Sequence, residues 1–223
     1  MSKKKKTLPA LERRYYAFEV RAEADEKTGG STITGRPIVY GSKTDIGGWF
    51  AEIIEPGALD GADLTDVRFL VNHNTSMIPL ARSRNNNENS TMQLTTDGEG
   101  MSMSANVDTA NNSTARELDS AVRRGDISGM SFMFSVADER WEDVDSDYPT
   151  RHILKIASVI EVSAVTFPAY EDTEINARGG ALESARAALE SARKTRRSKA
   201  PEGAADELAL AKAKNNIFKN FRR

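Results

Sequence analysis

The sequence predicts a mainly β domain of the α+β class with inserted helical structure, followed by a flexible, partly helical C-terminal tail. Short apolar runs, each ended by turn residues such as glycine and proline, fill most of the chain, which is typical of β-strands. One stretch near the middle has helical spacing instead, and the C-terminal part is rich in alanine. We therefore expect three parts: a flexible basic N-terminus at 1–14, a folded domain at 15–177 and a helix-prone basic tail at 178–223.

The first half of the domain is expected to contain four strands. YYAFEVRAE is rich in residues that favour strands, and GRPIVYGS carries a short apolar run closed by glycine. WFAEIIEPGALD holds a third strand, which the turn pair Pro56-Gly57 ends. In DVRFLVNH, the apolar residues Val67, Phe69 and Val71 recur with a period of two, so one face of this strand is expected to be buried.

A β-hairpin and a helix follow. MQLTTDGEGMSMSANV predicts the hairpin, because Asp97-Gly98 is a strong tight-turn signal and apolar residues alternate after it. TARELDSAVRRGD predicts the helix. Thr114 stands three residues before Glu117, which is the spacing of a capping box, and Gly125 can end the helix. Two more strands are then expected in ISGMSFMFSV and ILKIASVIEVSAVTF, on either side of a polar loop at 138–151.

The composition excludes several chemistries. The chain of 223 residues has no cysteine, so disulfides, thiolate metal sites and cysteine nucleophiles are absent. It has only two histidines, which argues against a histidine-rich metal site, and we expect no cofactor. No apolar run has the length of a membrane span, and the N-terminus lacks the core of a signal peptide. We expect a soluble protein inside a cell.

The charge is distributed unevenly along the chain. Residues 178–223 hold 12 Lys or Arg and 5 Asp or Glu, a net charge of +7, so the remainder carries −9 of the overall −2. The tail also repeats LESARAA/LESARK at a seven-residue spacing, but its apolar stripe is thin and an isolated helix of this kind is marginal. Two interpretations stay open: a solvated tail, or a segment that docks on an acidic or helical partner.

Ser131 is the candidate nucleophile. Side chains alternate along a strand, so Ser131 is expected to face away from Phe132 and Phe134 and to lie beside Gly129, which leaves room for a substrate. On the pattern alone, a serine in such a run is more often structural. Ser128 is the rival, but it would point to the aromatic face.

A serine nucleophile needs a base, and a third group must orient that base. His73 and His152 are the candidates for the base. Glu161 is a lone carboxylate inside an apolar strand, and a buried acid without a partner is costly. Its partner could be a histidine or a structural arginine such as Arg68 or Arg82.

Three motifs in order, LVNHNTSMIPLAR, GDISGMSFMFSV and IEVSAVTFPAYEDTEI, resemble the tailed-phage prohead serine protease family, and AEIIEPGAL resembles the segment before its histidine. The likeness runs from about residue 15 to residue 177. It implies a β-barrel related to herpesvirus assemblin, with His73 as base, Ser131 as nucleophile and Glu161 as the third catalytic residue. Assemblin relatives use a second histidine in the third role, so His152 stays open as an alternative to Glu161.

The resemblance also implies a function. Such proteases act inside the immature capsid, or prohead, in the host cytoplasm, where they cleave scaffold protein or the scaffold-like arm of the major capsid protein, and often themselves. By the same analogy we expect a homodimer, and a tail that targets the chain to the capsid or binds scaffold and that self-cleavage can later remove. The alternative is a non-catalytic assembly module of the same fold. The acidic body argues against nucleic acid as the main partner.

Overall fold

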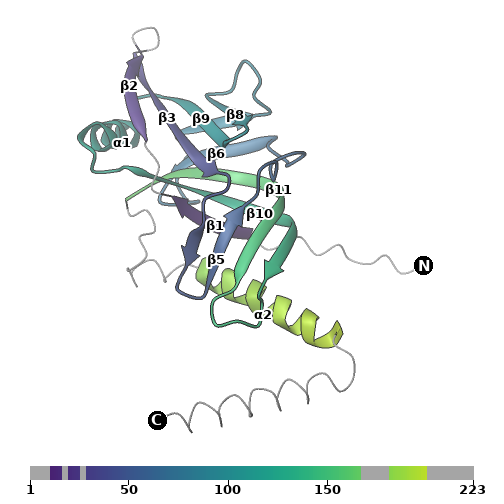
Figure 1. Ribbon diagram of the computed structural model, residues 1–223. Coiled ribbons are helices and arrows are strands. Elements are labelled where there is room, and N and C mark those ends of the chain that lie inside the picture. The colour runs from purple at the N-terminus through teal and green to yellow at the C-terminus, as the bar shows by residue number, and fades with distance from the viewer. Residues whose placement is uncertain (1–10, 17–19, 26–28, 167–180, 200–223) are drawn as a thin grey trace, which may run out of the picture. The chain divides into compact units, whose positions relative to one another are not determined.

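The computed structural model describes residues 11–16, 20–25, 29–166 and 181–199. The chain divides into two units, residues 1–185 and 186–223. Up to residue 166, the described part of the first unit consists of two β-sheets and one helix, drawn in Figure 1. The predicted class, mainly β with helices, is confirmed.

The larger sheet is built around two long antiparallel strands, β10 (Gly129–Glu142) and β11 (Thr150–Val165). One edge of β10 pairs with β1, and β11 pairs in parallel with both β5 and β6 at different points along its length. The remaining strands extend these pairs at the sheet margin. The bounds are β1 (Leu11–Tyr16), β4 (Thr44–Ile46), β5 (Phe50–Ile54), β6 (Asp66–Val71) and β7 (Ala81–Arg84).

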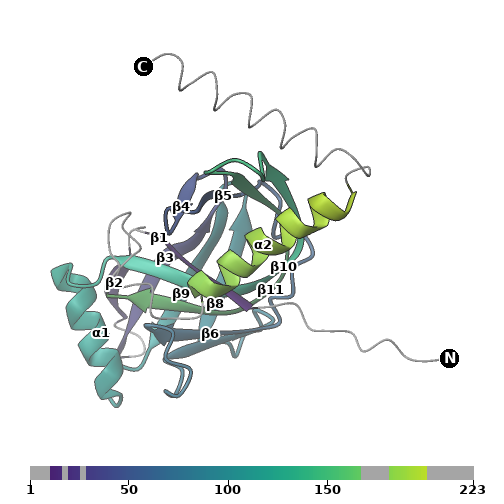
Figure 2. The same ribbon diagram turned by 90° about the horizontal axis from the view of Figure 1, so that it is seen from below.

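The smaller sheet has the strand order β2-β3-β9-β8. Its strands lie side by side in Figures 1 and 2, with helix α1 (Ser113–Arg124) next to β2. Because the described strands form two separate sheets, they close no barrel, and the barrel that the resemblance implied is not confirmed. The bounds are β2 (Arg21–Asp25), β3 (Gly30–Val39), β8 (Met92–Asp97) and β9 (Gly100–Val107).

The predicted hairpin is confirmed by β8 and β9. Alternate residues of β9 from Met101 to Val107 are buried in the core, as the pattern indicates. Gly100, at the start of β9, has φ 142°, and a Cβ there would lie 2.0 Å from the carbonyl oxygen of Ile38. Only glycine therefore allows β3 to approach β9 this closely.

Helix α1 is confirmed, but its N-cap is not Thr114. Asn112 has extended backbone angles, and its side chain accepts hydrogen bonds from the backbone N–H groups of Thr114 and Ala115, at 3.0 and 3.3 Å. Asparagine satisfies free N–H groups at this position as well as threonine does, which moves the cap two residues earlier. Gly125 ends the helix with φ 78°.

Two predicted boundaries are wrong. The loop expected at 138–151 is shorter and spans only 143–149, because β10 and β11 continue their pairing out to Glu142 and Thr150. Trp141 packs edge-on against Phe50 at 5.0 Å between ring centroids, which anchors this extension. At the N-terminus, β1 begins at Leu11, so the expected flexible segment 1–14 includes four residues of a strand.

The second helix is α2 (Ala181–Lys199); its first five residues belong to the first unit and the remainder to the second. This helix covers the repeated LESARAA/LESARK segment of the sequence. The predicted end of the domain at 177, and the tail beyond residue 199, lie outside the described residues. Neither described helix combines the length and apolarity that crossing a membrane requires.

Candidate active site

The site begins at the end of β6, where the chain makes a turn. Asn72 and His73 both have positive φ, 51° and 55°, a conformation that costs a side-chain-bearing residue about 1–2 kcal/mol. Asn72 offsets this cost by clamping β6 to β11. Its side-chain Nδ2 donates to Thr166 Oγ1 at 3.0 Å, and its side-chain Oδ1 accepts from the backbone N–H of Thr166 at 2.9 Å. The backbone N–H of Asn72 donates to the carbonyl oxygen of Ala164. The turn fixes the backbone that carries the His73 ring.

The three predicted site residues come together. His73 Nε2 lies 2.5 Å from Ser131 Oγ, and His73 Nδ1 is hydrogen-bonded to Glu161 Oε1. Each side chain comes from a different strand or strand end: His73 follows β6, Ser131 lies on β10 and Glu161 lies on β11. The pairing of β11 with both neighbours brings these segments side by side.

All three side chains are buried: Ser131 is 0%, Glu161 1% and His73 7% exposed. A buried carboxylate needs partners for both oxygens. Glu161 Oε1 has His73, and Glu161 Oε2 accepts from Ser163 Oγ at 2.6 Å. The sequence left two kinds of partner open for Glu161, a histidine or an arginine. The structure shows the histidine, His73.

Arg68 and Arg82, the two arginines weighed as partners for Glu161, bind another carboxylate instead. Both donate to Asp66, at 3.0 Å from Arg68 and at 2.6 Å from Arg82 Nε. Hydrogen bonding from Arg82 lowers the pKa of Asp66. These two arginines therefore pair with Asp66, and the carboxylate of Glu161 is held by His73 and Ser163.

Ser163 is a site residue that the sequence analysis missed. Its hydroxyl donates to Glu161 and accepts from the backbone N–H of His73 at 3.1 Å, so it ties the acid to the turn that holds the base. Its signal was present, because Ser163 stands two residues after Glu161 and a strand places such residues on one face. The pattern alone gave no reason to prefer it to other serines.

The Ser131 hydroxyl has a second partner, the backbone of β1. Its Oγ donates to the carbonyl oxygen of Arg14 at 2.6 Å. A hydroxyl carries one proton, so the Arg14 carbonyl and His73 Nε2 compete for it. No local sequence pattern indicates a role for Arg14, which lies 117 residues from Ser131.

The two rival residues lie elsewhere. His152 contacts two carboxylates, with Nδ1 at 2.6 Å from Glu55 and Nε2 at 3.2 Å from Glu142. Ser128 precedes β10 and is exposed, rather than facing the aromatic side chains as expected. Neither is brought to Ser131, His73 or Glu161 by any contact that the structure shows.

The arrangement has the chemistry of a nucleophile, a base and an orienting acid. An imidazole within hydrogen-bond distance of a hydroxyl can take its proton, and a carboxylate on the opposite ring nitrogen stabilises the imidazolium that results. Among the residues that the structure describes, no three His, Asp or Glu side chains gather in a way that could hold a metal ion.

Comparison with known proteins gives the family. The family model of the Caudovirus prohead serine proteases matches residues 17–187. The chain belongs to the Caudovirus prohead serine protease family. This match confirms the resemblance seen in the sequence, and it spans His73, Ser131 and Glu161.

Two individual proteins are similar to this member of the prohead serine protease family. The prohead protease of Enterobacteria phage HK97 is 31% identical over 163 residues, which cover 71% of this chain and 64% of that protein. The chain therefore spans less than two thirds of the length of this relative. The structure of the bacteriophage T4 capsid assembly protease is 14% identical, covers 72% of this chain and 99% of its own, and has a TM-score of 0.45.

Proposed function

We propose that this chain is a serine endopeptidase that acts in capsid maturation, with Ser131 as nucleophile, His73 as base and Glu161 as the orienting acid. The observation that carries the proposal is the continuous hydrogen-bonded series Ser131–His73–Glu161, in which each group is buried and faces the partner that its role requires. Family membership supports the same reading.

The proposed reaction is acyl transfer. His73 Nε2 accepts the proton of Ser131 as Oγ attacks a peptide carbonyl carbon, and Glu161 stabilises the imidazolium through Nδ1–H. The imidazolium then protonates the leaving amine, and the same ring activates a water that hydrolyses the acyl-enzyme. Ser163 holds Glu161 in place through both steps.

The proposed substrates are scaffold protein or the scaffold-like arm of the major capsid protein, together with the chain itself. The HK97 relative is named a prohead protease, which supports action inside the immature capsid in the host cell. The major capsid protein and scaffold are accordingly the proposed partners, and a homodimer stays a prediction.

The test is co-expression of the chain with the scaffold and capsid proteins of its own phage, followed by mass-spectrometric mapping of the fragments. We expect cleavage with the unchanged chain and with Ser128→Ala, and none with Ser131→Ala, whose small side-chain change leaves the fold intact. Ser128 is the matched control because it lies three residues away and outside the site. Cleavage that survives Ser131→Ala, or that is lost with Ser128→Ala, contradicts the assignment.

The alternative function is a non-catalytic assembly module. The observation in its favour is the burial of Ser131, since a peptide cannot reach a nucleophile that is 0% exposed. The same co-expression separates the two functions, because a module would be incorporated into capsids and leave the scaffold uncut. The backbone of β1 contacts Ser131 at Arg14. Burial excludes catalysis only if β1 cannot leave this position.

A further inference from the structure

Strand β1 covers the nucleophile. It pairs antiparallel with the edge of β10, and Tyr15 stands directly opposite Ser131 in the register. A strand added to a sheet edge is a common way for proteins to bind an extended peptide, because the main chain supplies the hydrogen bonds. In this chain, that edge is occupied by residues 11–16.

The carbonyl of Arg14 occupies the place where a scissile carbonyl belongs, but its orientation differs from that of a substrate. Its oxygen accepts the Ser131 proton at 2.6 Å. In a productive complex the carbonyl carbon faces the nucleophile, and the oxygen faces donors that stabilise an oxyanion. β1 is therefore placed as an occupant, and its register marks residue 14 as the equivalent of the residue before the scissile bond.

The Arg14 side chain is buried and is paired with acidic side chains. Its Nε and Nη2 form a two-pronged pair with Glu52, the latter at 2.7 Å, and Glu52 is 0% exposed. Burial acts to lower the pKa of Arg14, but Glu52 and Glu12 outweigh it and raise the pKa, so the guanidinium stays charged. A paired carboxylate at this depth matches an arginine in charge and in shape.

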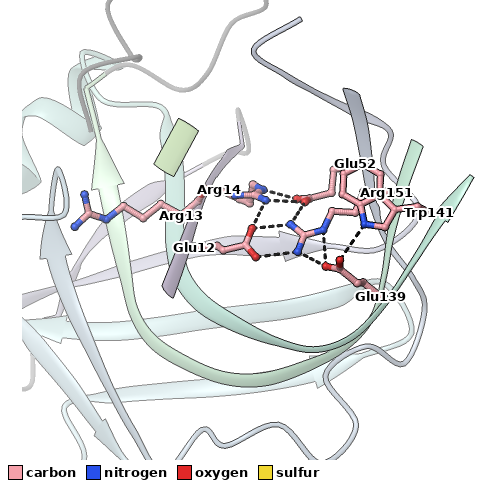
Figure 3. Close-up of polar contacts among 7 residues, drawn as sticks. All are labelled: Glu12, Arg13, Arg14, Glu52, Glu139, Trp141 and Arg151. Carbon is pink, nitrogen blue, oxygen red and sulfur yellow. Dashed lines mark hydrogen bonds and ion pairs between the residues drawn. The ribbon is translucent and has the colours of Figure 1, made fainter. Parts of the chain in front are cut away.

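A second ion pair lies two residues earlier on β1. Glu12 accepts from Arg151 Nη1 at 2.6 Å and from Nη2 at 2.9 Å, and Arg151 also contacts Glu52 and Glu139. Figure 3 shows these side chains gathered on one side of β1, whereas Arg13 points away from them. β1 therefore contributes an acidic and a basic side chain to this buried charged cluster, in the order acidic-x-basic.

We propose that the edge of β10 beside Ser131 is the peptide-binding site and that β1 is its internal occupant. A substrate strand binds antiparallel to β10 in place of β1, with a basic residue before the scissile bond on Glu52 and an acidic residue two positions earlier on Arg151. Glu52 is thus a specificity-determining residue, and the chain is inhibited until β1 leaves. This inference deepens the proposed endopeptidase function and rests on it.

The test measures peptide binding in the full-length chain, with Ser131→Ala in every variant so that nothing is hydrolysed. The probe is a fluorescently labelled LERRYY peptide, which copies residues 11–16, and the readout is fluorescence polarisation. We compare Arg14→Ala, which weakens the hold on β1 and frees one side of Glu52, with Arg13→Ala as the matched control. The Ser131→Ala chain alone should not bind, because β1 competes from the same chain at a high effective concentration.

Arg14→Ala is expected to bind the probe at least tenfold more tightly than Arg13→Ala does. For the Arg14→Ala chain, a probe with alanine at the position of Arg14 should bind at least tenfold more weakly than the LERRYY probe. A probe with alanine at the position of Arg13 should bind as tightly as LERRYY does. Adding Glu52→Gln to Arg14→Ala should abolish the preference for arginine. Equal binding by the two variants, or an unchanged preference after Glu52→Gln, overturns the inference.

Folding is checked by circular dichroism. Glu52 retains Arg151 at 3.0 Å when Arg14 is removed, so the carboxylate is not left unpaired. If Arg14→Ala nevertheless unfolds the chain, Arg14→Lys takes its place, because an ammonium keeps the charge and loses the two-pronged pair. Arg14→Lys should then bind the probe more tightly than Arg13→Lys does, and equal binding overturns the inference.

Because hydrolysis plays no part in these measurements, the two proposals can fail separately. Selective binding without any scaffold cleavage by the unchanged chain would reject the endopeptidase and retain the peptide site. Scaffold cleavage without selective binding would reject the role of β1 and Glu52 alone.

Discussion

At the scale of single residues, the site depends on a backbone conformation that side chains rarely adopt. His73 and Asn72 both lie in the left-handed region, and the clamp from Asn72 to Thr166 holds them there. In this conformation the His73 ring lies between the hydroxyl of Ser131 on β10 and the carboxylate of Glu161 on β11.

The first residue-scale prediction concerns Glu161. Glu161→Gln keeps the shape but removes the charge that stabilises the imidazolium, and the equivalent change in a serine protease triad lowers turnover about 10⁴-fold. We expect a loss of that order in cleavage of the scaffold, measured as initial rate. His152→Ala is the control, with an expected mild effect because its partners are Glu55 and Glu142. Equal losses of cleavage rate with Glu161→Gln and His152→Ala would favour a site with two histidines.

The second residue-scale prediction concerns Ser163. A hydrogen bond to a charged group contributes about 1.5–3 kcal/mol, so Ser163→Ala should lower the cleavage rate roughly 10- to 100-fold. Ser163 acts through Glu161 and His73, so the pH profile of the rate should shift as well, which a merely structural serine would not cause. Ser135→Ala is the matched control, since this serine lies on β10 and pairs with Ser158. An unshifted profile would argue against a positioning role.

At the scale of secondary-structure elements, β1 is held by ion pairs as well as by its ladder. Removing one partner of a buried pair commonly costs about 3–5 kcal/mol, whereas the intact pair adds little net stability over apolar packing. Such a contact fixes one register for β1, since Glu12 and Arg14 each find a charged partner only at that position. It also makes the element sensitive to a change at a single charge.

Acid should weaken β1 through Glu12. Burial acts to raise the pKa of Glu12, but Arg151 and Arg14 outweigh it, and the pKa lies below its ordinary value of 4.5. A lowered carboxylate pKa stabilises the fold above the ordinary value, and this contribution is lost as the pH falls through the folded-state value. We expect the stability gap between the unchanged chain and Glu12→Gln to be constant above pH 4.5 and to narrow below it, in thermal melts at successive pH values.

The matched control for this pH dependence is Glu88→Gln, which changes an exposed carboxylate. Its stability difference from the unchanged chain should stay constant across the same pH series. A gap for Glu12→Gln that widens as the pH falls would contradict the assignment of its ion pairs.

At the scale of the whole molecule, the main buried apolar cluster of the described residues lies within the first unit, although Leu189 of α2 is also buried. The buried apolar cluster runs from Val20 to Ala164 and includes no residue of α2. We therefore predict that a chain ending at Ala185 folds, with a melting temperature within about 3 °C of the full chain. Thermal unfolding followed by circular dichroism measures this, and a truncated chain without a cooperative transition would contradict it.

The same truncation tests the proposed targeting role of the tail. The tail carries a net charge of +7 from residue 178 onward, which suits an acidic partner. We expect the shortened chain to be poorly incorporated into capsids, measured by co-purification with assembled shells. Equal incorporation of both chains would leave the tail without this role.

Local patterns predicted much of the fold. The alternation of apolar residues located the strands, Asp97-Gly98 located the hairpin, and Leu118 and Val122 give α1 its buried face. These signals are local because a strand or helix is fixed by neighbours within a few residues. The order of three motifs also selected His73, Ser131 and Glu161, which the structure brings together.

The tertiary structure decided what depends on contacts between distant parts of the chain. Arg14 lies 117 residues from Ser131, and Glu12 lies 139 residues from Arg151, so no local pattern could join them. For the same reason Ser163 gained a role only when β11 was paired with β6 and the backbone of His73 came within reach of its hydroxyl. A charged pair such as Glu12 and Arg14 looks like a solvated surface in the sequence. It becomes a buried clamp only because Glu52 and Arg151 meet it from two other strands.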